Sequence, residues 1–170
     1  MNADPLILTL KLVDAAFARF DAERRRWFPP GLNRVPAHVT LFHHLPGEAE
    51  AEIAHTLRIA AAGQAPVAMR VTGVRNMGKG VAYQLASSEV AALRRRLADS
   101  WAPWLTRQDQ QPWRPHVTVQ NKVAPEAARA LHAALLARFQ PFDVRAEGLL
   151  LWRYLGGPWA AAGEFPFREA

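Results

Sequence analysis

Two copies of one short motif carry the residues best suited to chemistry in this chain. Motif 1 is His38-Val39-Thr40-Leu41, and motif 2, in the second half of the chain, is His116-Val117-Thr118-Val119. Both are rich in β-branched and apolar residues and follow a proline closely, which predicts short buried strands entered from turns. Side chains alternate along a strand, so we expect the His and Thr of each motif on one face and the apolar residues on the other.

Two imidazoles and two hydroxyls on facing strands suit phosphodiester cleavage by general acid and base. A neutral imidazole can take a proton from water while a protonated one gives a proton to the leaving oxygen. Hydroxyl groups can stabilise the charge on the non-bridging phosphate oxygens. Because burying such groups without partners costs about 1 to 3 kcal/mol each, we expect His38, Thr40, His116 and Thr118 to line a ligand-binding cleft. The sequence does not decide which histidine is the base.

This scheme needs no metal and no other cofactor. A two-histidine metal site is the rival interpretation, but a third ligand at a suitable spacing is not evident, and the acidic residues fall mostly on faces predicted to be exposed.

Four further residues are candidate substrate contacts. Arg75 and Lys79 flank the loop Asn76–Gly80, whose glycines expose backbone N–H groups that can bind a phosphate. Trp113 and Lys122 lie on either side of motif 2, and an aromatic ring near a cation suits stacking on a base while a phosphate is neutralised. A packing role for Trp113 in the core is equally compatible with its position.

Other basic residues fit surface roles. Alternation from His38 places Phe42 and His44 on the polar face of motif 1 and points His43 away from it, and we interpret both histidines as strand-end surface residues. Arginines 24–26 and 94–96 lie in expected helices, and we interpret them as solvated faces.

Hydrophobic periodicity predicts alternating strands and helices that position these residues. Strands are expected at 6–12, from 38 until Pro46 ends the strand, at 66–75, 81–87, 116–119 and 142–154, with a short edge strand around 165–167. Helices are expected at 14–28, 48–62, 88–104 and 125–139, the third capped by Ser87 or Ser88. Each half contains a His-Val-Thr strand, an alanine-rich helix and more strand, which indicates an internal duplication about a pseudo-two-fold axis.

The bulk properties indicate an ordered globular protein. The 170 residues are half hydrophobic, which suits one domain spanning 1–170. The absence of cysteine excludes disulfides, thiol nucleophiles and cysteine-ligated zinc. A net charge of +6 favours phosphate-bearing partners, although a generally arginine-rich composition would also explain it. No secretory signal or membrane span is recognisable, so we expect a cytoplasmic protein without a membrane partner; no obligate protein partner is evident, and a monomer is expected.

With both motifs placed, the chain resembles the 2H phosphoesterase superfamily, which includes bacterial RNA 2′,3′-cyclic phosphodiesterases, also named 2′-5′ RNA ligases. The mark of this superfamily is a pair of His-x-Thr/Ser-apolar motifs about half a domain apart, as in motifs 1 and 2. The order of strands and helices, Pro46-Gly47 after motif 1 and the strand pair around Gly78 are also similar. The resemblance implies a bilobal α+β fold with two pseudo-symmetric halves, antiparallel sheets around a central cleft and helices outside.

The resemblance also implies metal-independent catalysis by His38 and His116 with Thr40 and Thr118. Its substrates are cyclic phosphates or 2′-5′ linkages, on RNA or on a small nucleotide. We therefore expect a phosphodiesterase that opens a 2′,3′-cyclic phosphate to a 2′-phosphate, with 2′-5′ RNA ligase activity left open. Two alternatives remain: an enzyme for small cyclic nucleotides, such as a cyclic phosphate derived from ADP-ribose, and a non-catalytic RNA-binding protein that kept the cleft.

Overall fold

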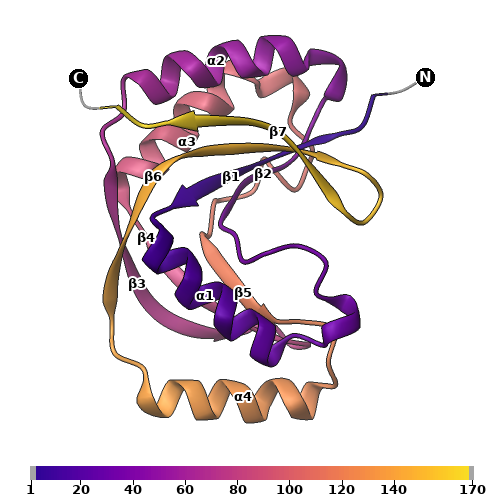
Figure 1. Ribbon diagram of the computed structural model, residues 1–170, viewed down its shortest axis with the longest axis vertical. Helices are drawn as coiled ribbons and strands as arrows, with labels where there is room; N and C mark the ends of the chain where they lie inside the picture. Colours follow the sequence, from indigo (N-terminus) through magenta and orange to yellow (C-terminus); the bar gives the residue numbers. More distant parts are fainter. Residues whose placement is uncertain (1–2, 169–170) are drawn as a thin grey trace.

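The computed structural model describes residues 3–168, and its centre is an antiparallel sheet of seven strands (Figure 1). The strands are β1 (Leu6–Leu12), β2 (Thr40–Leu45), β3 (Val67–Asn76), β4 (Val81–Ala86), β5 (His116–Gln120), β6 (Phe142–Tyr154) and β7 (Trp159–Pro166). The α-helices within these residues are α1 (Asp14–Trp27), α2 (Glu50–Ala62), α3 (Ser88–Ser100) and α4 (Pro125–Arg138). The predicted α+β class with antiparallel strands is confirmed, while the pseudo-symmetry of two halves stays a prediction.

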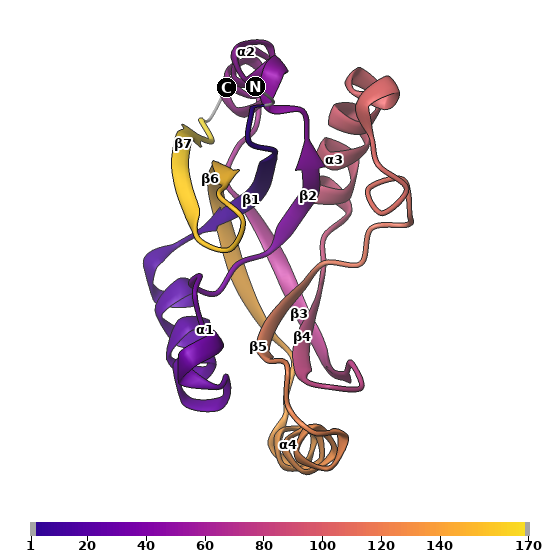
Figure 2. The same ribbon diagram turned by 90° about the vertical axis from the view of Figure 1, so that its right-hand side faces the viewer.

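The order of the strands puts the two motifs at opposite ends of the sheet. Neighbouring strands follow the order β2-β1-β6-β3-β4-β5, and β7 also pairs with β6. The start of β6 pairs with β3 and its later part with β1 and β7, so the strands form one continuous sheet where we expected more than one. In both views β2 lies in the upper half of the molecule and β5 in the lower half (Figures 1 and 2). The motif strands are therefore not hydrogen-bonded to each other.

The helices pack on different strands of this sheet. Helix α2 packs on β6 and β7 at the top of Figure 1, and α4 packs on β3 and β4 at the bottom. Helix α1 follows β1 but lies against β5. Helix α3 follows β4 but contacts β2, because Arg94 of α3 donates to the carbonyl oxygen of Leu41 and lies over the ring of Phe42. Among the helices in residues 3–168, none combines the length and hydropathy needed to cross a membrane.

Most predicted elements are confirmed, with differences at their ends. Strands 6–12 and 142–154 and the cap of α3 are as expected, the Ser87 hydroxyl accepting a hydrogen bond from the Val90 amide at 3.2 Å. The predicted helix 88–104 ends at Ser100, and Ala102–Trp104 forms a short 3-10 turn because Pro103 has no N–H to continue the α-helix. The edge strand at the C-terminal end, β7, is longer than expected.

Bulges in β2 overturn the expected alternation after motif 1. The register pairs Thr9 with Thr40, Leu8 with Phe42, and Leu6 with Leu45, so β2 carries extra residues relative to β1. As a result Leu41 and Phe42 are both fully buried, while His43 and His44 are both exposed. The prediction that Phe42 shares the polar face of the motif and that His43 points away from it is wrong.

Candidate active site

The two motifs present their polar and apolar residues to opposite sides, as predicted. Val39, Leu41, Val117 and Val119 are all fully buried in the core. His38, Thr40, His116 and Thr118 are all partly exposed. The apolar side of each motif therefore anchors it to the core while the His and Thr side chains stay accessible to a ligand.

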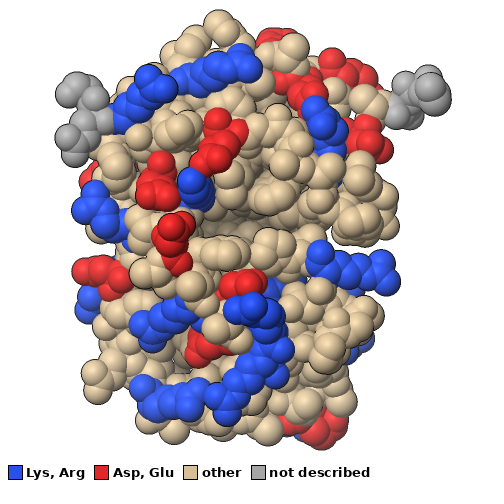
Figure 3. Space-filling view, viewed as in Figure 1, with Lys and Arg blue, Asp and Glu red and all other residues tan. Residues whose placement is uncertain are grey.

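Two adjoining cavities bring the motifs together although their strands are not paired. His38 and Thr118 line a cavity of about 480 Å³, which we call the His38 cavity. Thr40 and His116 line a cavity of about 350 Å³, which we call the His116 cavity. Each cavity thus takes its histidine from one motif and its threonine from the other, and the charge of His116 acts on His38, so the two motifs lie near each other. The face in Figure 3 is hollowed between the upper and lower halves.

Both catalytic candidates are held in the same way. Nδ1 of His38 donates to the carbonyl oxygen of Pro36 at 2.8 Å, and Nδ1 of His116 donates to the carbonyl oxygen of Arg114 at 2.8 Å. A carbonyl oxygen only accepts, so Nδ1 carries the proton in the neutral ring and Nε2 is the nitrogen left for a ligand. The contact to the residue two positions earlier fixes each ring relative to its own strand.

The electrostatic surroundings of the two imidazoles differ. Burial lowers the pKa of His38 to about 4; the hydrogen bond to Pro36 opposes this, and the positive charges of Arg24 and His116 add to it. Burial also lowers the pKa of His116, and the positive charge of Arg75 adds to that effect. His38 is therefore neutral at pH 7 in the free protein and ready to accept a proton.

Two buried arginines donate hydrogen bonds to the backbone of the motif strands. Arg24 of α1 donates from Nη1 to the carbonyl oxygen of Thr118 at 2.9 Å, and Arg94 of α3 donates from Nε to the carbonyl oxygen of Leu41 at 3.0 Å. Both side chains are buried, so interpreting them as solvated is wrong, whereas the neighbouring arginines at 25, 26, 95 and 96 are exposed as predicted. The helix from each half of the chain thus supports the motif of the other half.

A buried carboxylate next to motif 1 was missed by sequence reasoning. Asp109, in the connector after α3, accepts hydrogen bonds from the backbone N–H groups of His43 at 2.8 Å and His44 at 3.0 Å, and from Nδ1 of His43 at 3.0 Å. Burial alone would raise the pKa of Asp109, but these hydrogen bonds outweigh it and hold the pKa below its usual value. No local pattern marks Asp109, because its partners lie on a strand far away in sequence.

The predicted substrate contacts are placed unevenly. Arg75 and Trp113 line the His116 cavity, and Lys122 lines the His38 cavity, where its backbone is left-handed with φ 62°. Trp113 also donates from Nε1 to the carbonyl oxygen of Thr40 at 2.9 Å and packs partly on the core. Lys79 is exposed at the tip of the β3–β4 hairpin and lines neither cavity.

An aromatic surface beside His38 is a second feature that the sequence did not reveal. The ring of Trp159, at the start of β7, lies 4.8 Å from the ring of His38, and Trp152 lies 5.8 Å from Trp159, both between ring centroids. Tyr154 lines the His38 cavity together with Trp159. The sequence predicts only a short edge strand around 165–167 and no element at Trp159, because the hairpin that returns Trp159 to motif 1 has no local signal.

The chain is similar to known proteins in its sequence profile and in its fold. A family profile described as the 2′-5′ RNA ligase superfamily matches residues 12–158. The chain belongs to the 2′-5′ RNA ligase superfamily. This confirms the resemblance drawn from motifs 1 and 2. No curated protein sequence matches this superfamily member.

Solved structures share the fold of this superfamily member over nearly its whole length. The protein TT0787 of Thermus thermophilus matches with a TM-score of 0.69 at 19% identity, covering 96% of this chain and 98% of its own. E. coli LigT in complex with 3′-AMP matches with a TM-score of 0.61 at 16% identity, covering 98% and 99%. Kluyveromyces marxianus Usb1 matches with a TM-score of 0.52 at 15% identity, covering 98% and 99%. At these identities the likeness establishes the fold.

The two cavities are lined by side chains that can bind an anion. Within residues 3–168, no group of three or more His, Cys, Asp or Glu side chains is placed to hold a metal ion. The cleft offers two imidazoles, two hydroxyls and several guanidinium groups. The hydroxyl and guanidinium groups can donate hydrogen bonds to an anion, and the imidazoles can take up and release protons.

Proposed function

We propose that this protein is a phosphodiesterase that opens 2′,3′-cyclic phosphates, on RNA ends or nucleotides, to 2′-phosphates. The observation that carries the proposal is the crossed arrangement of the cleft, in which His38 lines a cavity with Thr118 and His116 lines one with Thr40. A phosphate bound between the motifs meets one imidazole on each side, as in-line attack and departure require. In this proposal the whole chain is one domain whose halves, built in the orders β1-α1-β2-α2 and β4-α3-β5-α4, contribute one motif each.

In the proposed reaction His38 is the base and His116 is the acid. Nε2 of His38 takes a proton from water, whose oxygen forms a bond to phosphorus. The bond from phosphorus to the 3′ oxygen breaks, and Nε2 of His116 gives that oxygen its proton, which leaves a 2′-phosphate and a 3′-hydroxyl. The hydroxyls of Thr40 and Thr118 donate to the non-bridging oxygens. The lowered pKa of His38, which leaves its imidazole neutral at pH 7, supports this assignment.

In this proposal the cleft binds a nucleotide and can also support ligation. LigT, which shares the fold, has been crystallised with 3′-AMP, ATP and NADP+, all nucleotides, which supports a nucleotide in this cleft. If a 5′-hydroxyl takes the place of water, the same proton transfers form a 2′-5′ linkage, so ligation is the corresponding second activity.

The pH dependence tests the assignment of acid and base. The value of kcat/KM depends on the free enzyme, so it requires neutral His38 and protonated His116. We expect kcat/KM for 2′,3′-cyclic AMP to be highest on the acid side of neutral, to fall below about pH 4 as His38 is protonated, and to fall as the pH rises through the lowered pKa of His116. Rates measured from about pH 3 to about pH 8 check this.

One variant sharpens the pH test. The positive charge of Arg75 lowers the pKa of His116, so Arg75→Met should move the alkaline limb of the profile to higher pH. A profile that keeps rising beyond pH 7, or an alkaline limb that Arg75→Met leaves in place, contradicts the role of His116 as the acid.

The substrate is tested by direct comparison. The protein is incubated with 2′,3′-cyclic AMP and with an oligoribonucleotide that ends in a 2′,3′-cyclic phosphate, and products are separated by chromatography. Release of a 2′-phosphate from either supports the proposal, and the relative kcat/KM chooses between nucleotide and RNA. Binding of the oligonucleotide without hydrolysis of either substrate would favour the non-catalytic alternative.

A further inference from the structure

Positive side chains line both cavities of the cleft. The His116 cavity is lined by the guanidinium groups of Arg75, Arg94 and Arg114 and by the imidazole of His43. The His38 cavity is lined by the cations Arg24, Arg34 and Lys122 and by the aromatic rings of Trp159 and Tyr154. A ligand that extends beyond the phosphate between the motifs therefore meets further cations at either end.

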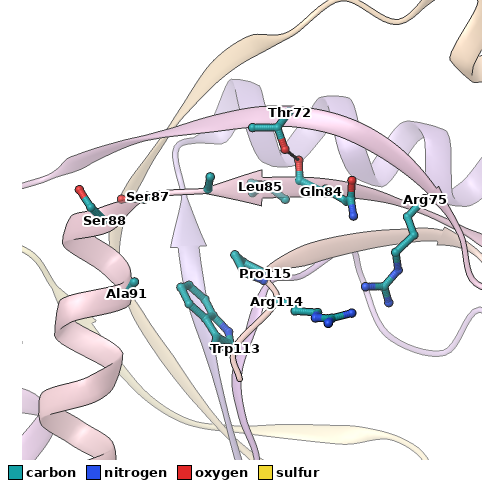
Figure 4. A pocket seen from close by; sticks show the side chains of 11 residues that line it. Thr72, Arg75, Gln84, Leu85, Ser87, Ser88, Ala91, Trp113, Arg114 and Pro115 are labelled. Carbon is teal, nitrogen blue, oxygen red and sulfur yellow. Dashed lines mark hydrogen bonds between the residues drawn. The ribbon is translucent and has the colours of Figure 1, made fainter. Parts of the chain in front are cut away.

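Two of these guanidinium groups are available to a ligand. Arg94 is committed, because it donates to the carbonyl oxygens of Leu41 and Asp109. Neither Arg75 nor Arg114 takes part in an ion pair formed within residues 3–168. Figure 4, which draws a neighbouring cavity that both arginines also line, shows their side chains close to each other, one from the end of β3 and the other from the segment before β5. Two cations without an acidic partner in one cavity favour an anion there.

His43 is positioned to complete this group. Its Nδ1 is held by the carboxylate of Asp109 at 3.0 Å, and the side chain of Asp109 is fully buried while that of His43 is 41% exposed. The ring is therefore fixed at one nitrogen and free at Nε2. When protonated, it donates to Asp109 from Nδ1 and to a ligand in the cavity from Nε2.

These donors exceed what one phosphate needs. The phosphate that reacts already has two imidazoles and the hydroxyls of Thr40 and Thr118. We infer that the His116 cavity is a subsite for a second phosphate of the substrate, held by Arg75, Arg114 and His43. The inference rests on the proposed function, because it places that phosphate on the 5′ side of the nucleotide whose cyclic phosphate is opened. A 5′-monophosphate and the 5′-phosphodiester of an RNA chain share this chemistry.

The test compares three substrates that differ only on the 5′ side. They are 2′,3′-cyclic AMP, its 5′-phosphorylated form, and the dinucleotide that carries a 5′-phosphodiester in place of the monoester. A hydrogen bond to a charged group contributes enough to raise kcat/KM about tenfold or more, so we expect the wild type to prefer a 5′-phosphorylated substrate by at least that factor. Preference for the monoester alone indicates a free nucleotide, and equal preference for the diester indicates an RNA end.

The variants locate the effect. In Arg114→Ala and His43→Ala we expect the ratio of kcat/KM with and without the 5′-phosphate to fall towards one. Arg58→Ala, which removes an exposed arginine from α2, is the matched control and should keep the wild-type ratio. Hydrolysis of all three substrates with a wild-type ratio near one, or a ratio that neither variant changes, overturns the subsite and leaves the proposed function standing.

A binding measurement decides the inference if no substrate is turned over. That outcome removes the proposed function, and calorimetry then compares adenosine 2′,5′-bisphosphate with adenosine 2′-monophosphate. Tighter binding of the bisphosphate that is lost in Arg114→Ala supports the subsite. Equal affinity for the two nucleotides overturns it.

Discussion

We expect His38→Ala and His116→Ala each to lower kcat/KM for a 2′,3′-cyclic nucleotide at least about 100-fold, because removal of a positioned acid or base costs that much or more. The two groups act in one transition state, so the double variant should lose much less than the product of the two single effects. Both rings are partly exposed and bonded only to a backbone carbonyl, so removing either should leave the fold intact. Steady-state kinetics with each purified variant give the measurement.

His55→Ala is the matched control for this prediction. His55 is exposed on α2, away from both cavities, and its replacement should leave kcat/KM within about twofold of the wild type. Thermal unfolding of each variant separates lost chemistry from lost structure. If a correctly folded single variant retains more than about a tenth of the wild-type kcat/KM, that histidine is not an acid or base in the reaction.

The largest expected effect on the free energy of unfolding comes from replacing Asp109. Asp109→Ala should lower the free energy of unfolding by about 3 kcal/mol or more, because it leaves two backbone N–H groups without their acceptor and takes the nearest negative charge from the buried guanidinium of Arg94. Urea denaturation at neutral pH measures this. Because the folded pKa of Asp109 lies below its usual 3.8, its stabilising contribution is present above that pH and is lost as the pH falls through the folded value.

Two comparisons make the stability result specific. Asp99→Ala removes an exposed carboxylate from α3 and should change the free energy of unfolding by no more than about 0.5 kcal/mol. The difference between Asp109→Ala and the wild type should shrink in acid, whereas the Asp99 variant should show no such trend. An Asp109→Ala protein as stable as the wild type at neutral pH would mean that water replaces the carboxylate at these amides.

The local parts of the site could be predicted from the sequence. Each motif carries its own information, since alternation of polar and β-branched residues fixes which side chains enter the core and which remain accessible. The crossed pairing of His38 with Thr118 could not be predicted in the same way. It depends on the order of strands in the sheet and on its bending, and motif residues at opposite ends of a sheet give no local sign that they meet.

The burial of charged residues could not be predicted from the local sequence. The local sequence around Arg24, Arg94 and Asp109 does not distinguish them from surface residues. Only their hydrogen bonds to distant segments reveal that they are buried. The bulges in β2 belong to the same class, because they arise from pairing with β1 and reverse the expected side of His43. Side chains whose surroundings come from distant segments are those that sequence reasoning placed wrongly.

A reaction carried by His38 and His116 is tested by product formation from 2′,3′-cyclic AMP in the presence of EDTA, by the wild type and by the two histidine variants. We expect the wild type to release 2′-AMP at the same rate with and without the chelator, and His38→Ala and His116→Ala both to release almost none. Hydrolysis that stops in EDTA, or that persists in either variant, would contradict a reaction carried by two histidines.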